Sequence, residues 1–453
     1  MARTDSTTAT SRGLVLAVMC TGYFLVLLDV TVVNVALPRI GAGLGAGVAG
    51  LQWVVDGYAL ALAALLLASG TVGDRWGHKR VVLLGMLLFG AASLGCAVAP
   101  VTGVLIAARA VQGIGAALLL PGTLAIISRA SPEPGEQAKA IGVWAGVGSV
   151  ALPAGPLLGG LLVDGLGWRW VFAINVPIVV IAGLATRRLV RDDAGRGDRR
   201  LDPPGTVLVV IGLAAATFTI IQSGHAGVGA AVVVGAVVAV AAFAGLVAAE
   251  RRAAEPLLPP ELLRRPAFAT ANAVAGCMNL GSLGLVFLLT LFLQTVQHRP
   301  AVLAGLAVLP LFLPLTLLAP VAGRIAGRVG PKPVMIAGLV LAAVGVALLS
   351  TWDSHSSYVA LLPAMSCWGV GLAVLTPAVV AAAIAAAPPD RSGLASGVNN
   401  TARQAGGAIG IAVYGAVAGP PDGGHFLTGL HVMGLSTAAL FLVASCVVIF
   451  SNE

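Results

Sequence analysis

The chain has 453 residues, of which 58% are hydrophobic and only 10% are charged, and its formal net charge is +8. This composition excludes an ordinary soluble domain. A basic balance can indicate nucleic-acid binding, but we ascribe the excess here to arginines on loops beside hydrophobic segments. We therefore expect no nucleic-acid partner.

Fourteen hydrophobic runs of membrane-spanning length, about 20 residues each, follow one another along the chain. They lack the alternating pattern of barrel strands, and backbone polar groups in lipid need partners within their own segment, so each run is predicted to be a helix. The runs cover residues 13–37, 50–72, 80–100, 103–127, 138–162, 168–187, 205–223, 227–249, 268–294, 301–323, 333–351, 357–387, 397–418 and 427–449.

The basic residues are distributed unevenly between the loops. With span boundaries read to within a few residues, 22 of the 26 Lys and Arg residues fall on the N-terminal tail and the even-numbered loops. Arg39, Arg169 and Arg299 fall on the odd-numbered loops, and Arg109 lies within a span. The positive-inside rule then predicts a multi-pass protein of the inner (cytoplasmic) membrane with both termini in the cytoplasm. The abundance of Ala, Gly and Arg over Lys indicates a bacterium with a high-GC genome.

The spans divide into two sets of six around an additional pair. Residues 1–12 form a polar cytoplasmic tail, 13–187 a first six-helix bundle, 205–249 two additional spans, and 268–449 a second six-helix bundle. The end of span 2 aligns without gaps with the end of span 10, as expected of an internally duplicated transporter. The second copy has Gly327 opposite Asp74, so the two loops are not chemically equivalent. The matching pairs are Gly70 with Gly323, Arg75 with Arg328, Gly77 with Gly330, and Lys79 with Lys332.

Three ionisable residues lie well inside the spans, where a charge is costly and a function is expected. A carboxyl group in an apolar site tends to keep its proton, so Asp29 could exchange protons, and a nearby Arg109 would favour its charged form. We expect these two residues to form a coupled proton or substrate site; the alternative is that Asp29 is a static partner of Arg109. Asp56 is a further candidate, unless it reaches interfacial water beside Trp53 and Tyr58.

Span 5 presents one helical face made of small residues and prolines, which permits close helix contact and local bending. Span 10 is itself interrupted by Pro310, Pro314 and Pro320. At the cytoplasmic end of span 13, Asn400, Arg403 and Gln404 share a face and either line the inner mouth of a pathway or cap the helix. The face of span 5 comprises Gly142, Gly146, Ser149, Pro153, Pro156 and Gly160.

Five motifs in order resemble a known family. The loop Gly70–Arg80, with Gly70, Asp74, Arg75, Gly77, Lys79 and Arg80, resembles the signature between spans 2 and 3 of the major facilitator superfamily. Four further stretches resemble its fourteen-span drug:proton antiporter branch: Leu28–Pro38, Arg109–Gly115, Gly155–Gly160 and Asn399–Gly407.

This resemblance implies an all-α fold, with two six-helix bundles around a central cavity and two extra central helices. It also implies proton-coupled export of hydrophobic drug-like or antibiotic molecules by alternating access. The loop would serve the conformational switch, the alternative being a loop that only sets orientation. The antiporter helix, which would pack where the halves meet, carries Pro153, Gly155, Pro156, Gly159 and Gly160.

We expect a monomer that handles small hydrophobic substrates, protons and membrane lipids, with no cofactor and no metal, driven by the proton gradient. No phosphate-binding loop of the GxxxxGK[ST] kind occurs. No span combines residues in a Ser/His/Asp, metal or paired-carboxylate arrangement, so we do not expect an enzyme. The alternatives are an importer or facilitator of the same fold, or a membrane sensor or scaffold that transports nothing.

Overall fold

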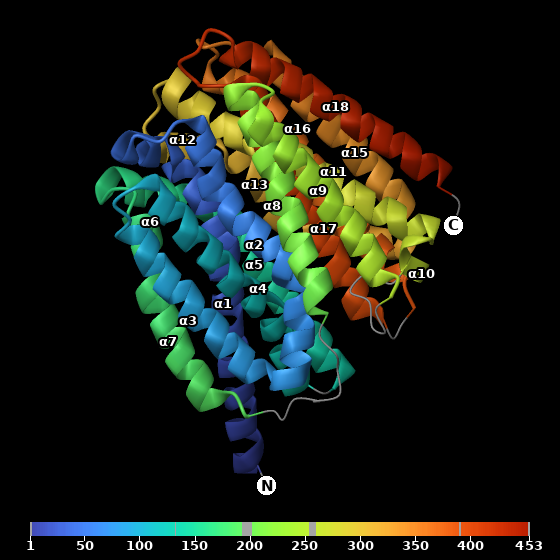
Figure 1. Cartoon of the computed structure of the whole chain (residues 1–453). Coiled ribbons are helices and arrows are strands. Elements are labelled where there is room, and N and C mark those ends of the chain that lie inside the picture. Colours follow the sequence, from blue (N-terminus) through green and yellow to red (C-terminus); the bar gives the residue numbers. More distant parts are fainter. Residues whose placement is uncertain (1, 132, 193–201, 253–259, 389–390, 452–453) are drawn as a thin grey trace.

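The computed structural model describes residues 2–131, 133–192, 202–252, 260–388 and 391–451, and they form a helical bundle (Figure 1). The helices are α1 (Ala2–Leu44), α2 (Val48–Trp76), α3 (His78–Ala97), α4 (Thr102–Ala130), α5 (Pro134–Gly165), α6 (Trp170–Ala173), α7 (Asn175–Leu189), α8 (Pro203–Ala226), α9 (Ala230–Glu250), α10 (Pro260–Leu263), α11 (Pro266–Leu291), η1 (Phe292–Val296), α12 (Ala301–Ala307), α13 (Leu309–Leu317), α14 (Ala319–Val329), α15 (Pro331–Ala347), η2 (Leu348–Thr351), α16 (Tyr358–Ala385), α17 (Ser392–Ala418) and α18 (Phe426–Phe450).

Within the described residues, 12 helices are long and apolar enough to cross a membrane, and the bent pair of α13 and α14 raises the number to 13. Helix α17 covers the predicted span 397–418 but is not among them. Its first half carries Asn399, Asn400, Arg403 and Gln404, which lower its hydropathy. Helix length and composition therefore establish 12 or 13 spans, and the predicted fourteen are not confirmed.

The predicted interruption of span 10 is confirmed at Pro310 and Pro320 but is wrong at Pro314, which lies within α13. The segment is divided into α12, α13 and α14, with breaks at Val308 and Leu318, and α13 and α14 are bent by 50°. Pro310 and Pro320 lie in the first turns of α13 and α14, where the missing N–H group is tolerated, so each proline marks the start of a new helix. Helix α1 also differs from its prediction, since it begins at Ala2 and continues through Pro38 to Leu44.

Helices α1–α7 form the N half of the molecule, and α11–α18 form the C half. Helix α8 packs against α2 of the N half and α17 of the C half, and α9 packs on α8 (Figure 1). Most of α8 and α9 is left uncovered by the rest of the protein. In the hydrophobic 18-residue stretch of each helix, only 28% and 22% of the residues, respectively, are buried. Their exposed side chains are hydrophobic, so this pair lies between the halves and lipid.

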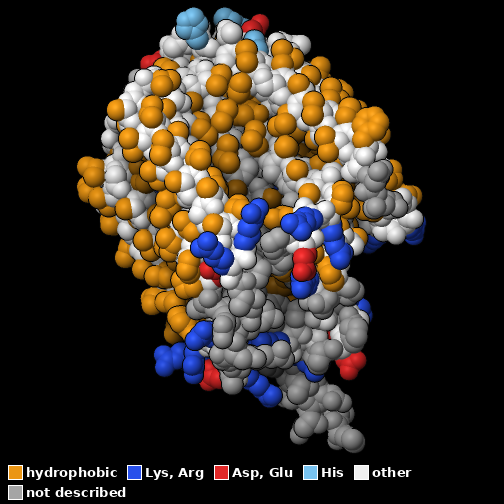
Figure 2. All heavy atoms as spheres, turned by 45° about the vertical axis from the view of Figure 1, so that its right-hand side comes forward, with side chains coloured by type: hydrophobic (Ala, Val, Ile, Leu, Met, Phe, Trp, Pro, Cys, Tyr) orange, Lys and Arg blue, Asp and Glu red, His pale blue; other side chains and the backbone are white. Residues whose placement is uncertain are grey.

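The two ends of the bundle differ in charge. Figure 2 shows a broad band of hydrophobic side chains with Lys and Arg gathered at one end of the molecule. We call this the basic end; α2 meets α3 and α14 meets α15 there. At the far end, α1 meets α2 and α5 meets α6. The described residues thus have the charge asymmetry that the sequence predicted.

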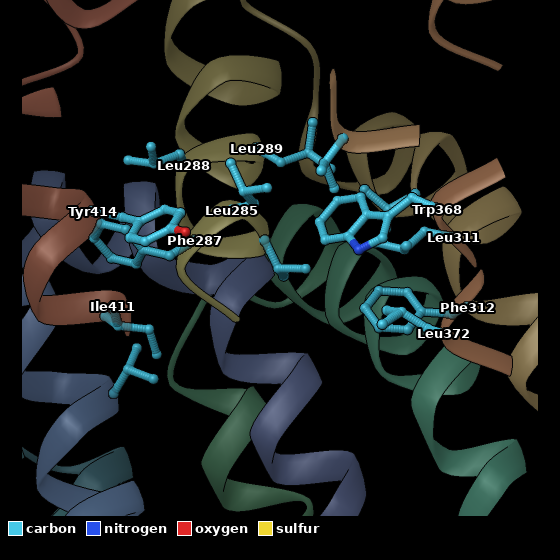
Figure 3. Packing of buried hydrophobic residues seen from close by; sticks show 14 of the residues in the cluster. Leu285, Phe287, Leu288, Leu289, Leu311, Phe312, Trp368, Leu372, Ile411 and Tyr414 are labelled. Carbon is cyan, nitrogen blue, oxygen red and sulfur yellow. The ribbon is translucent and has the colours of Figure 1, made fainter. Parts of the chain in front are cut away.

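The largest hydrophobic cluster that both halves share lies toward the far end, and a smaller one between α2 and α17 continues the contact toward the middle of the molecule. The far-end cluster joins α1, α2 and α4 with the helices of the C half. Figure 3 shows part of this cluster, in which Phe287 of α11, Trp368 of α16 and Tyr414 of α17 are buried among other hydrophobic side chains. Toward the basic end the core divides into an N-half cluster around Met86 and a C-half cluster around Phe268. The halves are therefore packed tightly at the far end, while toward the basic end α2 and α17 remain in contact through Leu67 and Gly397.

The internal duplication has a backbone counterpart. Gly77, between α2 and α3, has φ 92°, and its predicted equivalent Gly330, between α14 and α15, has φ 86°. A side chain is strained at such angles, so the glycine at each equivalent position is needed for the tight turn between two helices.

We expect Gly77→Ala and Gly330→Ala each to lower the free energy of unfolding by about 1–3 kcal/mol because of the positive φ. Gly327→Ala is the matched control: it is helical and a Cβ there meets nothing within 4 Å, so it should be neutral or stabilise by about 0.5–1 kcal/mol. Thermal unfolding in detergent measures both effects. Equal melting temperatures for all three variants would contradict the argument.

Candidate transport site

A buried ion pair lies inside the N half. Asp29 of α1 accepts a hydrogen bond from Arg109 Nη1 of α4, and its other oxygen accepts one from Gln112 Nε2 at 2.9 Å. Arg109 also donates to Gln112 Oε1 at 2.7 Å and, through Nε, to the Val54 carbonyl of α2 at 3.0 Å. Asp29 and Gln112 are 0% exposed and Arg109 is 1% exposed. The structure thus brings together the two charges that the sequence singled out.

Further side chains complete the network around this pair. Gln112 Nε2 donates to Ser93 Oγ of α3 at 2.9 Å, and Asn175 Nδ2 of α7 lies 3.5 Å from Asp29 Oδ1. The Arg109 guanidinium lies 4.3 Å from the centre of the Tyr58 ring. Both Asp29 oxygens therefore have partners and the cation is covered by an aromatic face. Such a closed network fits the alternative in which Asp29 is a static partner of Arg109.

Asp56 of α2 has the opposite environment. It is 0% exposed, and neither carboxyl oxygen has a hydrogen-bond partner among the described residues. The expectation that it might reach interfacial water is wrong. Its helix packs here against α8 and α17, with Ala59, Leu213 and Ala408 in one apolar cluster. An ionised carboxylate in such surroundings is costly, so the neutral acid is the favoured form.

Helix α5 touches both halves through different small residues. A Cβ at Gly155 would collide with Thr31 of α1, and one at Gly159 would lie 3.0 Å from the Val32 carbonyl oxygen, so these two glycines serve packing within the N half. A Cβ at Gly160 would instead lie 2.5 Å from Val302 Cα of α12. The seam between the halves therefore depends on Gly160, with Pro156 beside it.

The opposing glycine of this seam is Gly305 of α12. A Cβ there would collide with the Pro156 carbonyl oxygen of α5. Where two glycines face each other's backbone in this way, two helices approach more closely than side chains allow.

The same face of α5 is open toward the basic end. A Cβ at Gly142 or Gly146 meets nothing within 4 Å of the described chain. The change occurs near Ser149, whose carbonyl accepts a hydrogen bond at 2.7 Å from Thr316 Oγ1 of the C half. The α5 face is thus closed against the C half in its far part and open in its basic part.

A cavity of about 530 Å³ lies on the basic half of α1 and α5. Beside it, the Tyr23 and Trp144 rings stack with centroids 3.7 Å apart and an interplanar angle of 14°. Phe24 and Val143, the chain neighbours of these rings, belong to the cavity wall. Its lining residues are Gly13, Leu16, Ala17, Cys20, Thr21, Phe24, Val143 and Val147.

The loop between α2 and α3 is held by its polar residues. Asp74 Oδ1 lies 3.2 Å from His78 Nε2 in the first turn of α3, and Lys79 Nζ lies 3.1 Å from Asp192 Oδ1, which follows α7. Arg75 and the neighbouring Arg80 are exposed. Asp74 therefore joins the end of α2 to the start of α3, a contact that a loop serving orientation alone does not need.

The three polar residues of predicted span 13 lie deeper than expected. Arg403 is about three helical turns from Ser392, the first residue of α17, so helix capping is excluded for it. Asn400, Arg403 and Gln404 are all partly buried.

Several residues that tie the halves together escaped the sequence analysis. Gln52 Nε2 of α2 donates to the Ile411 and Ala412 carbonyls of α17 at 2.9 and 2.8 Å. Gln294 Nε2 donates to the Val35 carbonyl at 2.8 Å, and Asp164 Oδ2 accepts from the Val302 N–H at 2.8 Å. A lone amide in an apolar run is a weak signal, because its partner lies on a helix remote in sequence.

Two helical halves, a shared core at one end and an open seam at the other define a polytopic transporter. Residues 19–411 match the family model described as Major Facilitator Superfamily. The chain belongs to the Major Facilitator Superfamily.

Its relatives and structural neighbours agree. It is 34% identical over 418 residues to Multidrug resistance protein Stp of Mycobacterium tuberculosis, covering 92% of this chain and 76% of that protein. It is 38% identical over 407 residues to Puromycin resistance protein pur8 of Streptomyces alboniger, covering 89% and 81%. A mutant of the nucleoside transporter NupG has the same fold, with a TM-score of 0.69 at 13% identity over 97% of this chain and 100% of that one.

Removing one member of the buried pair should be costly. We expect Arg109→Met to lower the free energy of unfolding by about 3–5 kcal/mol, because Asp29 is left as an uncompensated charge. The double variant Asp29→Leu/Arg109→Met should recover most of this loss. Melting temperatures in detergent test the difference; a double variant less stable than Arg109→Met would contradict it.

A bulky residue in the seam should separate the halves. Gly160→Leu places a side chain against Val302 and should cost about 1–3 kcal/mol in the far-end contact. Gly142→Leu, on the same helix face but with free space around it, is the matched control. Cross-linking of paired cysteines at the far end of α5 and α12 reports the separation. The prediction fails if both leucine variants cross-link as the parent does.

Proposed function

We propose that this protein is a proton-coupled efflux transporter that exports hydrophobic drug-like or antibiotic molecules across the cytoplasmic membrane by alternating access. The names of its relatives, multidrug and antibiotic resistance proteins, support the cargo class. The observation that carries the mechanism is the α5 seam, closed at Gly160 and open at Gly146. Alternating access requires one end to close while the other opens.

The orientation follows from charge. The basic end is proposed to face the cytoplasm, with both termini there, so the open side of the seam and the cavity receive molecules from inside the cell. Helix α17 is proposed as the fourteenth span. It packs among α2, α8 and α11, so its polar residues are shielded from lipid in spite of their cost.

Asp56 is proposed as the proton carrier, in preference to Asp29. Its carboxyl group is fully buried and has no hydrogen-bond partner among the described residues, so it would hold a proton while the far end is closed. Rearrangement of the α2–α17 contact during transport would expose it and release the proton. Asp29 would hold α1, α4 and α7 together through Arg109 and Gln112. The loop with Asp74 would act as the conformational switch.

The energy source is proposed to be the proton gradient, with no cofactor and a monomer as the working unit. A panel of ethidium, rhodamine 6G and puromycin in cells with and without the protein tests the cargo class. Protection should disappear when an uncoupler collapses the gradient. Protection that survives the uncoupler would instead indicate a facilitator of the same fold.

Asp56→Asn should abolish proton release when a transported dye is added to the purified protein, since the amide has no proton to exchange near neutral pH. Dye binding should remain, because an amide mimics the neutral acid. Asp29→Asn is the comparison and should still release protons. A pH-sensitive dye in weakly buffered detergent, followed between pH 5 and 9, measures the release. If Asp56→Asn releases protons as the parent does, Asp56 is not the carrier.

A further inference from the structure

The connection from α11 to α12, residues 292–302, departs from regular helix at two points; we call it the strap. It begins with η1, a π turn in which the Gln297 N–H donates to the Phe292 carbonyl at 2.9 Å. His298 follows with φ 52°, and among the described residues it is the only non-glycine with a positive φ. A side chain is disfavoured at such an angle, so the strap holds backbone strain.

Two glutamines bind the strap to opposite halves of the molecule. Gln294 Nε2 donates to the Val35 carbonyl of α1 in the N half at 2.8 Å. Gln297 Nε2 donates to the Ser356 carbonyl at 3.0 Å, in the C-half connection between η2 and α16. The strap therefore depends on the relative position of the two halves.

Asp164 of α5 fastens the other end of the strap to the N half. Its Oδ2 accepts a hydrogen bond from the Val302 N–H at 2.8 Å, and Arg39 Nη2 of α1 lies 3.8 Å from its Oδ1. Val302 lies in the first turn of α12, where N–H groups have no partner within the helix, and Pro300 before it provides no side-chain acceptor. A charged acceptor makes this bond stronger than one between neutral groups.

The strained residue lies between anchors on opposite halves. His298 follows Gln297, which is bound to the C half, and precedes Val302, which is bound to the N half through Asp164. Close contact at the seam fixes this arrangement, since a Cβ at Gly160 would lie 2.5 Å from Val302 Cα. If the halves separated there, one anchor would be free and His298 could return to the negative φ that side chains prefer.

We propose that the strap is a strained latch of the far end. The bond from Val302 to Asp164 holds this end closed, and the strain at His298 favours its opening once that bond is lost. The closed and open populations are then set by the difference between these two opposing contributions. This inference rests on the proposed alternating access and names the residues that balance its far-end step.

A cysteine in the closed seam reports how often the far end opens. Ala301, at the start of α12, is 1% exposed, so Ala301→Cys should react with a charged thiol reagent only in molecules whose far end is open. The reagent is 2-(trimethylammonium)ethyl methanethiosulfonate, applied to the protein in nanodiscs without drug or proton gradient. Protein that keeps Ala301 gives the background from the native cysteines. When opening is fast, the reaction rate follows the open population.

In this background, Asp164→Ala should raise the rate about tenfold or more, as expected for the loss of a hydrogen bond to a charged acceptor. Asp164→Asn should raise it less, because the amide oxygen can still accept from the Val302 N–H. Asp422→Ala is the matched control, since it removes an exposed carboxylate from the far-end connection between α17 and α18. An unchanged rate in Asp164→Ala, or an equal rise in Asp422→Ala, overturns the proposal.

The strain is tested by a pair of substitutions at an exposed side chain, where folding is not at risk. His298→Gly tolerates the positive φ and should lower the rate about fivefold or more. His298→Ala is the matched control, because alanine is disfavoured at this φ as histidine is, and it should react as the parent does. Equal rates in the glycine and alanine variants overturn the role of strain and with it the latch.

This experiment is independent of transport. If the variants change the labelling rate as expected but the parent gives no protection against ethidium, rhodamine 6G or puromycin, export fails and the latch stands. If the parent protects cells and all variants are labelled at the parent's rate, the latch fails and export stands.

Discussion

The arrangement depends on direct backbone contact between α5 and α12. At Gly160 and Gly305 no side chain separates the two helices, so the halves meet at van der Waals distance and share one hydrophobic core at the far end. Toward the basic end α5 still presents glycines, but none of the described C-half residues lies within 4 Å of a Cβ placed at Gly142 or Gly146. The cavity and the Tyr23–Trp144 pair lie along this basic part of α5, with α1 beside it. A single helix thus makes the contact that closes one end and borders the space that is open at the other.

Much of this architecture could be predicted from the sequence, because membrane helices are specified by long hydrophobic runs and by the distribution of arginines. The equivalence of Gly77 and Gly330 followed from a gapless alignment, and both have positive φ. The sequence could not show which neighbouring helix each glycine of α5 packs against. Gly155 and Gly160 belong to the same small-residue stretch, yet one packs on α1 and the other on α12. Periodicity shows that a helix has a small-residue face and does not show which neighbour covers it.

The roles of the buried acids were also beyond the sequence. Asp29 and Asp56 are both carboxyl groups in apolar runs, and both are 0% exposed. The difference lies in partners that come from other helices: Arg109, Gln112 and Asn175 surround Asp29, whereas none of the described residues makes a hydrogen bond to the Asp56 oxygens. A charged carboxylate is stabilised in the first environment and penalised in the second. A buried carboxyl group can therefore be assigned a structural or a proton-carrying role only when its hydrogen-bond partners on other helices are known.

The hydrogen bonds made across the halves by Gln52, Gln294, Thr316 and the Val302 N–H have a consequence for the proposed alternating access. Each is short-ranged and would be lost if the far end opened, as the proposed alternating access requires. A net contribution of about 0.5–1.5 kcal/mol per bond gives a total of a few kcal/mol. Reversing a two-state population from 1:99 to 99:1 takes about 5.5 kcal/mol, so this total is of the size that one bound molecule or one proton can offset. For the proposed cycle, the far-end contact would thus be strong enough to hold that end closed at rest and weak enough for a bound molecule or proton to open it.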